Sequence, residues 1–220
     1  MPHPKGNCAA IFANFVENNQ AMKRCVTVRP ARREDARLIA EAVAMAIGDE
    51  VALRAYCGDD YLEVLTAIAA REGTQYSWQN GLVAEVEGRA AGAVVGYDGG
   101  RLKVLREGTF EVLRELVGRT PTIVDETEVG EYYLDSVAVL PEWRTLGVGR
   151  ALVVAFCERA FVEGHERVGL IVDCANPKAE QLYASLGFVR VGSRDFFGHQ
   201  MWHLQLLLRG EGRDCGVRLK

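Results

Sequence analysis

Residues Leu134–Leu152 have the sequence LDSVAVLPEWRTLGVGRAL, and no other stretch of the chain is as informative. The apolar residues before Pro141 predict a β-strand over Tyr132–Val139, which the proline ends because it cannot donate to a strand ladder. A tight loop with two glycines follows. Val148–Val162 then places apolar residues at helical spacing. The stretch therefore predicts a strand, a glycine loop and a helix in that order.

The loop before this helix has the composition of an anion-binding site. Gly147 and Gly149 have no side chains, so the backbone N–H groups there can come close to a ligand. The start of a helix adds unpaired N–H donors and the positive end of the helix dipole. Arg144 and Arg150 flank the loop and can screen phosphate charge. Together these features suit a pyrophosphate group.

Other interpretations of the loop were weighed against this one. A dinucleotide fingerprint, G-x-G-x-x-G, would need a third glycine where the chain has Leu152. The Walker pattern G-x-x-x-x-G-K-[ST] is absent from the loop as well. On the spacing alone, a strand-to-helix turn that binds no ligand stays an alternative.

The periodicity of the remaining chain predicts one mixed α/β domain. Apolar runs and alternation predict strands at residues 26–29, 82–86, 90–95, 168–173, 188–191 and 201–208. Helical spacing predicts helices at residues 32–47, 59–70, 109–117 and 177–186. Asn176 and Pro177 suit the N-cap and first position of the last helix. Residues 120–130 are polar and turn-rich, which predicts a loop.

The composition is that of an ordinary globular domain. The chain has 220 residues, of which 49% are hydrophobic and 25% charged, so a sizeable core can form. A net charge of -4 gives no electrostatic reason to bind nucleic acid or a membrane surface. The six cysteines have irregular spacing and form no C-x-x-C pair, which favours a reducing compartment. We therefore expect a cytoplasmic protein.

The domain organisation is expected to be simple. Met22 opens a strand-like segment, so residues 1–21 are interpreted as an N-terminal extension and 22–208 as a single domain. Residues 98–130 form an insertion in that domain, and the polar, glycine-rich residues 209–220 form a tail. No apolar run approaches the roughly 18 residues that a membrane-spanning helix requires.

Four motifs resemble those of the GNAT superfamily of acyl-CoA N-acyltransferases. The first is R-x-x-G-x-G-R-A-L after V-A-V-x-P, which looks like the acyl-CoA motif of that family. Residues 28–31 with Asp35-Ala36 resemble its first strand and helix, and Gly92–Gly96 resembles its third strand. The late helix resembles the pattern N-x-x-A-x-x-x-Y-x-x-x-G-F, with Asn176, Ala179, Tyr183, Gly187 and Phe188. The resemblance covers about residues 24–208, in the order found in the family.

The resemblance implies a mixed, mostly antiparallel sheet of six to seven strands flanked by helices. Its fourth and fifth strands, here Tyr132–Val139 and Val168–Asp173, are expected to splay apart and to hold acetyl-CoA between them. The pantetheine arm would pair with the backbone of Val137, Ala138 and Val139. The remaining residues expected to bind the cofactor are Arg144, Thr145, Leu146, Gly147, Val148, Gly149, Arg150, Ala151, Asn176 and Ala179.

The chemistry implied by the family is direct attack of an amine on the thioester. The leaving thiolate needs a proton or an equivalent hydrogen bond, for which Tyr183 is the candidate because a phenol is protonated at neutral pH. Its alternative role is packing on the sheet. The backbone N–H of Val137 is the candidate donor to the oxyanion.

The base that deprotonates the amine is less clearly indicated. Some family members have a glutamate on the fourth strand, at a position that corresponds to Tyr133 here. Asp135 lies two residues along and is the preferred candidate, with a structural hydrogen-bonding role as its alternative. Glu131, the solvent, or one of the late histidines His199 and His203 are the other candidates.

We therefore predict an N-acetyltransferase that moves the acetyl group of acetyl-CoA to a primary amine of a small molecule or of a peptide or protein. The alternatives are a non-catalytic acyl-CoA sensor on the same fold and an interaction protein that docks a partner through residues 98–130. No His, Cys, Asp and Glu residues have metal-ligand spacing, so no metal is expected. No nucleic acid or membrane partner is expected, and a homodimer is allowed because dimers are common in the family.

Overall fold

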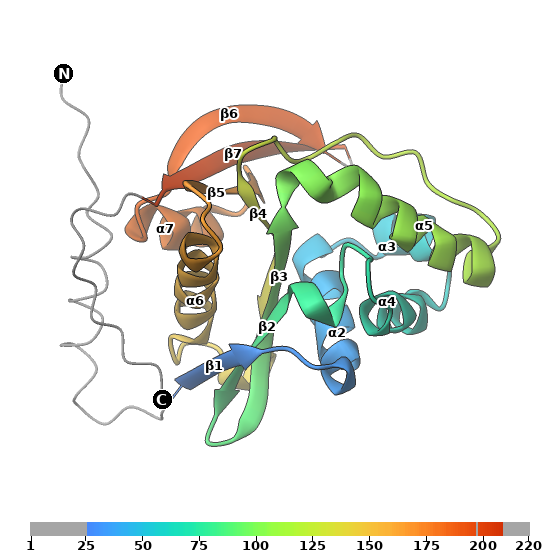
Figure 1. Cartoon of the computed structure of the whole chain (residues 1–220), viewed down its shortest axis with the longest axis horizontal. Helices are drawn as coiled ribbons and strands as arrows, with labels where there is room; N and C mark the ends of the chain where they lie inside the picture. Colours follow the sequence, from blue (N-terminus) through green and yellow to red (C-terminus); the bar gives the residue numbers. More distant parts are fainter. Residues whose placement is uncertain (1–25, 197, 209–220) are drawn as a thin grey trace.

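Seven strands form one sheet in the order β1-β2-β3-β4-β5-β7-β6 in the computed structural model (Figure 1), which describes residues 26–196 and 198–208. Adjacent strands are antiparallel, except that β4 and β5 are parallel. This confirms the expected mixed, mostly antiparallel sheet. The strands are β1 (Val26–Pro30), β2 (Gly81–Val86), β3 (Arg89–Asp98), β4 (Tyr132–Val139), β5 (Arg167–Asp173), β6 (Val189–Phe196) and β7 (His199–Leu207).

Helices cover both faces of the sheet (Figure 1). One face carries α6 (Val148–Val162) and α7 (Pro177–Ser185), and the other carries α2 (Ala36–Ile47), α3 (Glu50–Cys57), α4 (Tyr61–Ala70) and α5 (Leu102–Val117). Four short 3-10 helices lie between these elements: η1 (Arg33–Asp35), η2 (Trp78–Asn80), η3 (Gly99–Arg101) and η4 (Pro141–Trp143).

The two largest hydrophobic clusters of the described residues lie one on each face of the sheet, and a third, smaller one joins α5 to β3 and β4. Leu152, Phe156 and Ala160 of α6 are fully buried against the sheet in the first core. Ile39, Val43 and Ile68 of the α2–α4 layer are fully buried in the second. Burying a large aliphatic side chain stabilises the fold by about 1.5–3 kcal/mol, so the two cores hold the sheet rigidly between the helices.

The expected splay of the fourth and fifth strands is present. Strands β4 and β5 are in register only at Tyr132↔Val168 and Tyr133↔Gly169, beyond which they separate. A β-bulge starts the separation: Leu134 pairs with Gly96 and Ser136 with Val95, which leaves Asp135 without a partner on β3. A bulge bends its strand and twists it more strongly, so the half of β4 after Asp135 diverges from β5.

Several element boundaries differ from those expected from the sequence. Helix α3 was missed: Gly48 does end α2, but Asp49 directly caps a new helix by accepting hydrogen bonds from the N–H groups of Val51 and Ala52. Helix α5 begins at Leu102 rather than at 109, because Asp98-Gly99-Gly100 forms a capped turn into the helix instead of a break.

Other expectations concern the ends of the chain and the insertion. Residues 120–130 form neither a helix nor a strand, which confirms the loop expected there. The extension at residues 1–21 and the tail at 209–220 lie outside the described residues. Within the described part of the chain, no helix has the length and apolar character needed to cross a membrane.

Candidate active site

A cavity of about 280 Å³ lies where β4 and β5 separate. Asn176, Ala179 and Tyr183 line it from the side of α7. Residues of α2, α3 and α5 line it from the opposite face of the sheet, among them Met45, Tyr56 and Arg106. The cavity therefore connects the two faces of the sheet through the splay, and residues 133–137 of β4 run along it.

The α6 loop, residues 144–150, lies beyond the end of β4. Thr145 and Gly147 have positive φ angles of 66° and 81°, so the chain turns sharply before α6. Gly147 is the N-cap residue of α6 and supplies no side-chain hydrogen bond to the first turn. The N–H of Ala151 donates to the Gly147 carbonyl oxygen over 3.0 Å, so the N–H groups of Val148, Gly149 and Arg150 before it are the ones available to a ligand or solvent.

Two arginines hold the α6 loop in place. Arg144 Nε donates to the carbonyl oxygen of Val139 over 3.3 Å, which ties the loop to the end of β4. The guanidinium of Arg150 donates to Ser185 Oγ over 2.8 Å, which ties the start of α6 to α7.

Gly149, in the first turn of α6, lies between the end of β4 and helix α7. A Cβ atom at this residue would be 3.5 Å from Val139 Cγ2 and 4.0 Å from Leu182 Cδ2. The bare backbone of α6 at Gly149 thus lies beside the end of β4 and α7, although no residue of the α6 loop lines the cavity itself.

Tyr183 lies on α7, one helical turn from Ala179. The helix begins at Asn176, whose side-chain oxygen accepts from the N–H of Ala179 at 3.1 Å. Tyr183 is 7% exposed and contacts the edge of Phe188, with ring centroids 5.7 Å apart. Burial raises the pKa of Tyr183 to about 12. The phenol is therefore protonated at neutral pH and has a proton with which it can donate a hydrogen bond.

Asp135, the bulge residue, presents its carboxylate to the same cavity. Tyr97 donates to Oδ2 over 2.7 Å and Ser136 donates to Oδ1 over 2.9 Å. Burial raises the pKa of Asp135, and these two hydrogen bonds oppose that shift in part. The carboxylate is consequently a stronger base than an exposed aspartate.

A second buried carboxylate, Glu126, lines the cavity and was missed by the sequence analysis. Its Oε2 forms an ion pair with Arg106 of α5 at 2.5 Å. The amide of Gln75 bridges Glu126 to Tyr97, with its Nε2 3.4 Å from Glu126 Oε1 and 3.1 Å from the Tyr97 hydroxyl. Burial and the charge of Asp135 raise the pKa of Glu126 to about 7, although Arg106 opposes that shift.

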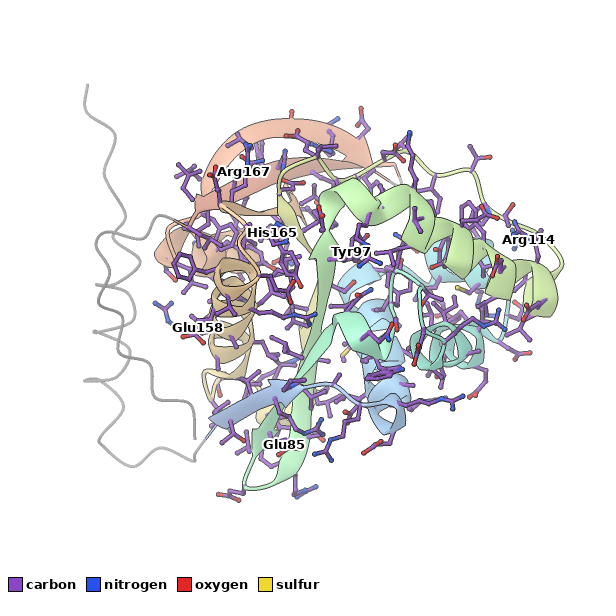
Figure 2. The ribbon with its side chains drawn as sticks, in the orientation of Figure 1. Glu85, Tyr97, Arg114, Glu158, His165 and Arg167 are labelled. Atoms are coloured by element: carbon purple, nitrogen blue, oxygen red, sulfur yellow. The ribbon has the colours of Figure 1, made fainter. Side chains whose placement is uncertain are left out.

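No short sequence motif predicts the hydrogen-bonded residues around Glu126, because they come from segments that are distant along the chain. Gln75 precedes η2, Tyr97 is on β3, Arg106 is on α5, and Glu126 is in the loop before β4. Figure 2 shows Tyr97 beside β3, on the side of the sheet that α5 covers. Only the unusual position of a charged Arg106 within the apolar face of α5 could have been noticed from the sequence.

The structure places Glu131, the alternative base, outside the cavity. It is fully buried and accepts hydrogen bonds from the N–H of Glu128 at 2.8 Å and from Gln205 Nε2 at 2.9 Å, while its Oε2 lies 3.0 Å from His203 Nε2. Glu131 and His203 thus join the start of β4 to β7, which is a structural role.

His199 lies apart from that pair and does line the cavity. Its Nδ1 is 2.9 Å from Asp173 Oδ2, which fixes the orientation of the ring.

Glu128, Glu131 and His203 are close enough together to hold a metal ion. The guanidinium of Arg194 occupies the same space, 3.1 Å from Glu128 and 2.9 Å from His203 Nδ1. Hydrogen bonds thus already join these side chains to Arg194 and to one another, so they fit a hydrogen-bonded network better than a metal site.

The comparison with protein families identifies the family to which this fold belongs. The model of the "Acetyltransferase (GNAT) family" matches residues 51–188, which include β4, the α6 loop and Tyr183. The chain belongs to the GNAT acetyltransferase family. A solved structure described as "The crystal structure of acetyltransferase" is 31% identical to this GNAT chain, with a TM-score of 0.71, and the match covers 83% of this chain and all of the other. An N-acetyltransferase from Staphylococcus aureus Mu50 is 25% identical, with a TM-score of 0.69, over 82% of this chain and all of the other.

Curated relatives have a more specific name. A mycothiol acetyltransferase of Paenarthrobacter aurescens (strain TC1) is 35% identical over 156 residues, which is 68% of this chain and 46% of the relative. A mycothiol acetyltransferase of Thermobispora bispora is 47% identical over 62 residues, or 28% of this chain and 20% of the relative. The chain thus spans less than half the length of these relatives.

Proposed function

We propose that this chain transfers an acetyl group from acetyl-CoA to a primary amine by direct attack, with Asp135 as the base and Tyr183 as the donor to the leaving sulfur. The observation that carries the proposal is that both side chains line one cavity, which crosses the sheet at the splay. The cofactor would enter from the side of α7 and the amine from the side of α3 and α5.

The cofactor is held mainly by backbone groups in this proposal. The first turn of α6, from Val148 to Ala151, and the loop residues Arg144 to Gly147 bind the diphosphate. Val137, Ala138 and Val139 pair with the pantetheine arm on the open half of β4, and Asn176 and Ala179 of α7 lie beside it. The lack of a side-chain cap on α6 supports this arrangement, because the N–H groups are left for the ligand.

The amine must lose a proton before it attacks, since an alkylammonium has a pKa near 10.4. Asp135 takes this proton, directly or through a water molecule, and its raised pKa makes it suited to the task. The amine nitrogen then bonds to the thioester carbonyl carbon, with the oxyanion held by the N–H of Val137. The nitrogen loses its second proton to the solvent as the carbon–sulfur bond breaks and the thiolate departs.

Tyr183 stabilises the departing thiolate. Because the pKa of Tyr183 is raised to about 12, complete transfer of its proton to a thiolate, whose pKa is near 8.5, is uphill. The phenol therefore acts mainly by donating a hydrogen bond to the developing charge, and the thiolate receives its proton from the solvent.

The size of the cavity favours a small acceptor. A volume of about 280 Å³ is near the lower limit of ligand pockets, which typically span roughly 300–1,000 Å³. The proposal therefore favours a small amine, or the exposed end of a longer chain, over a folded protein surface. The name of the curated relatives makes a mycothiol-type acceptor one candidate among several.

An amine panel assayed for release of the coenzyme A thiol tests the proposal. We expect acetyl-CoA to be consumed only when an acceptor amine is present, and mass spectrometry to find the acceptor heavier by one acetyl group. Binding of acetyl-CoA without turnover on any amine would instead favour the non-catalytic sensor. The double variant Asp135→Asn, Tyr183→Phe is the control for background hydrolysis.

A further inference from the structure

The half of the cavity opposite α7 contains a buried polar group that the proposed mechanism does not use. Gln75, Arg106 and Glu126 line the cavity there, and they are 3%, 7% and 5% exposed. We call these three residues the acceptor subsite. Buried polar atoms are normally hydrogen-bonded, so any that are not require an explanation.

The amide oxygen of Gln75 lacks a hydrogen-bond partner within the described part of the chain. The orientation of this amide is fixed by its neighbours. The Tyr97 hydroxyl already donates its proton to Asp135, so it can only accept from Gln75 Nε2. Turning the amide would also set its oxygen against the carboxylate of Glu126. The unpartnered atom is therefore an oxygen, and it needs a donor.

Glu126 has an underused oxygen of its own. Its Oε2 is engaged by Arg106, whereas its Oε1 makes a long 3.4 Å contact with Gln75 Nε2, and the N–H of Glu126 itself also interacts with this carboxylate. The two terminal nitrogens of Arg106 are already bonded, one to Asp125 and the other to Glu126 and the carbonyl oxygen of Val124. Among the described residues, Arg106 Nε also has no hydrogen-bond partner.

The charges that line the cavity also favour a ligand that donates hydrogen bonds and is positively charged. Its lining includes the carboxylates of Asp49, Glu126, Asp135 and Asp173. Arg106 neutralises only one of them, and His199 lies against Asp173. The phenol rings of Tyr56, Tyr76 and Tyr133 complete the wall, and aromatic faces accept a cation.

The acceptor subsite is rigid, because the loop that carries Glu126 is held from two sides. Arg106 of α5 bonds to Asp125, Glu126 and the backbone at Val124. Arg194 of β6 donates to the carbonyl oxygen of Glu126 over 2.7 Å. A site whose groups are held in place before binding loses less entropy when the ligand arrives.

We propose that the acceptor subsite binds a second, non-reacting ammonium group of the acceptor, so that the chain acts preferentially on diamines. An ammonium has three N–H donors and a positive charge, which match the acceptor oxygens of Gln75 and Glu126. The first amine of the same molecule reaches Asp135 and the thioester. This inference rests on the proposed function and names its substrate class.

Kinetics on a series of α,ω-diaminoalkanes, each paired with the n-alkylamine of equal carbon number, test the inference. We expect kcat/KM to be at least about thirtyfold higher for the best diamine than for its partner monoamine, the scale of a buried charge pair. An ω-amino carboxylate of equal length should react more slowly than the monoamine. Equal rates on diamines and monoamines would overturn the inference and leave the proposed function standing.

Two substitutions locate the effect. Glu126→Gln and Gln75→Met should each lower the diamine-to-monoamine ratio toward one, mainly through a higher KM for the diamine. Asp125→Asn is the matched control, since Asp125 is also paired with Arg106 but does not line the cavity. An equal loss of preference in Asp125→Asn would show that Glu126 acts only by holding Arg106, and would overturn the inference.

Calorimetry covers the case in which no amine is acetylated. The diamine is titrated into the wild-type protein saturated with coenzyme A, and melting curves establish that each variant is folded. Heat of binding in the wild type that is lost in folded Glu126→Gln would support the subsite although the proposed function had failed. If no amine is acetylated and the wild type also fails to bind the diamine, both the proposed function and the diamine inference are contradicted.

Discussion

The α6 loop and the acceptor subsite differ in what they are made of. The loop presents the backbone of Gly147, Gly149 and the first turn of α6, and it is contiguous in sequence. The acceptor subsite presents the side chains of Gln75, Arg106 and Glu126, which are up to 51 residues apart along the chain. One region can therefore be recognised from a short motif, whereas the other exists only after the chain has folded.

This difference has a functional consequence. A site built from backbone groups depends less on the identity of the side chains around it, so its expected diphosphate ligand need not change when those side chains change. A site built from side chains on α5 and its following loop can change with a few substitutions, without disturbing the cofactor. We therefore expect a bulky side chain at Gly149 of the α6 loop to abolish activity on every amine, and substitutions in the acceptor subsite to change which amine is used.

The largest expected effect is at Gly149. Replacing it with valine would put methyl groups between Val139 and Leu182, where the cofactor must pass. In the wild type, acetyl-CoA at a hundredfold excess over Kd should stabilise the fold by about 2.7 kcal/mol, seen as a higher Tm. Gly149→Val should show no shift. Gly192→Val is the control, because a Cβ at Gly192 meets nothing within 4 Å, and its shift should be that of the wild type.

The second expectation concerns the base. Asp135→Asn keeps the shape of the side chain, and Ser136 can rotate its hydroxyl to serve either atom of the new amide. Turnover should fall roughly 10²- to 10⁴-fold while acetyl-CoA binding is unchanged. Asp98→Asn, at the end of the adjacent strand and outside the cavity, should keep normal turnover. Normal turnover in Asp135→Asn itself would leave His199 or the solvent as the proton acceptor.

The pH dependence of the free energy of unfolding gives a second test of Asp135→Asn. The pKa of Asp135 is raised in the folded state, so its contribution to stability is present below the unfolded pKa and is lost as the pH rises through the folded pKa. Ionised Asp135 should therefore destabilise the fold at neutral pH. We expect Asp135→Asn to unfold at a higher denaturant concentration than the wild type near pH 7, with the difference vanishing in acid.

The sequence predicted the bounds of β4 and α6 well, but it did not predict the acceptor subsite. Strand β4 has the expected bounds, because alternation, Pro141 and the glycine loop are local signals. Glu126 is flanked by turn-forming residues and looks like a solvated loop residue, yet it is buried because Arg106 and Arg194 reach it from 20 and 68 residues away. Helix α3 was missed since Gly48 is a genuine helix end and gives no sign that Asp49 starts another.

The third expectation separates chemistry from packing at Tyr183. Tyr183→Phe keeps the ring against Phe188, so folding and acetyl-CoA affinity should be preserved. The loss of the hydroxyl should lower kcat by roughly 10²-fold. The defect should shrink on an acyl thioester with a more acidic thiol, since a better leaving group needs less stabilisation. Tyr132→Phe removes a buried phenol outside the cavity and should leave kcat unchanged; equal kcat in both variants would make Tyr183 a packing residue.

The smallest expected effect is at Arg144, which tests whether side chains contribute to the backbone-built loop at all. The residue is exposed and its only described hydrogen bond is the 3.3 Å contact with the Val139 carbonyl, so solvent and salt screen its charge. Arg144→Ala should raise the Kd for acetyl-CoA by only about threefold to tenfold at low salt, with the difference shrinking as salt is added. Arg114→Ala, at the far end of α5 (Figure 2), controls for the change in net charge and should leave the Kd unaltered. A loss in Arg144→Ala that does not depend on salt would mean that this arginine acts by holding the loop to β4 rather than through its charge, and the α6 loop would then depend on a side chain as the acceptor subsite does.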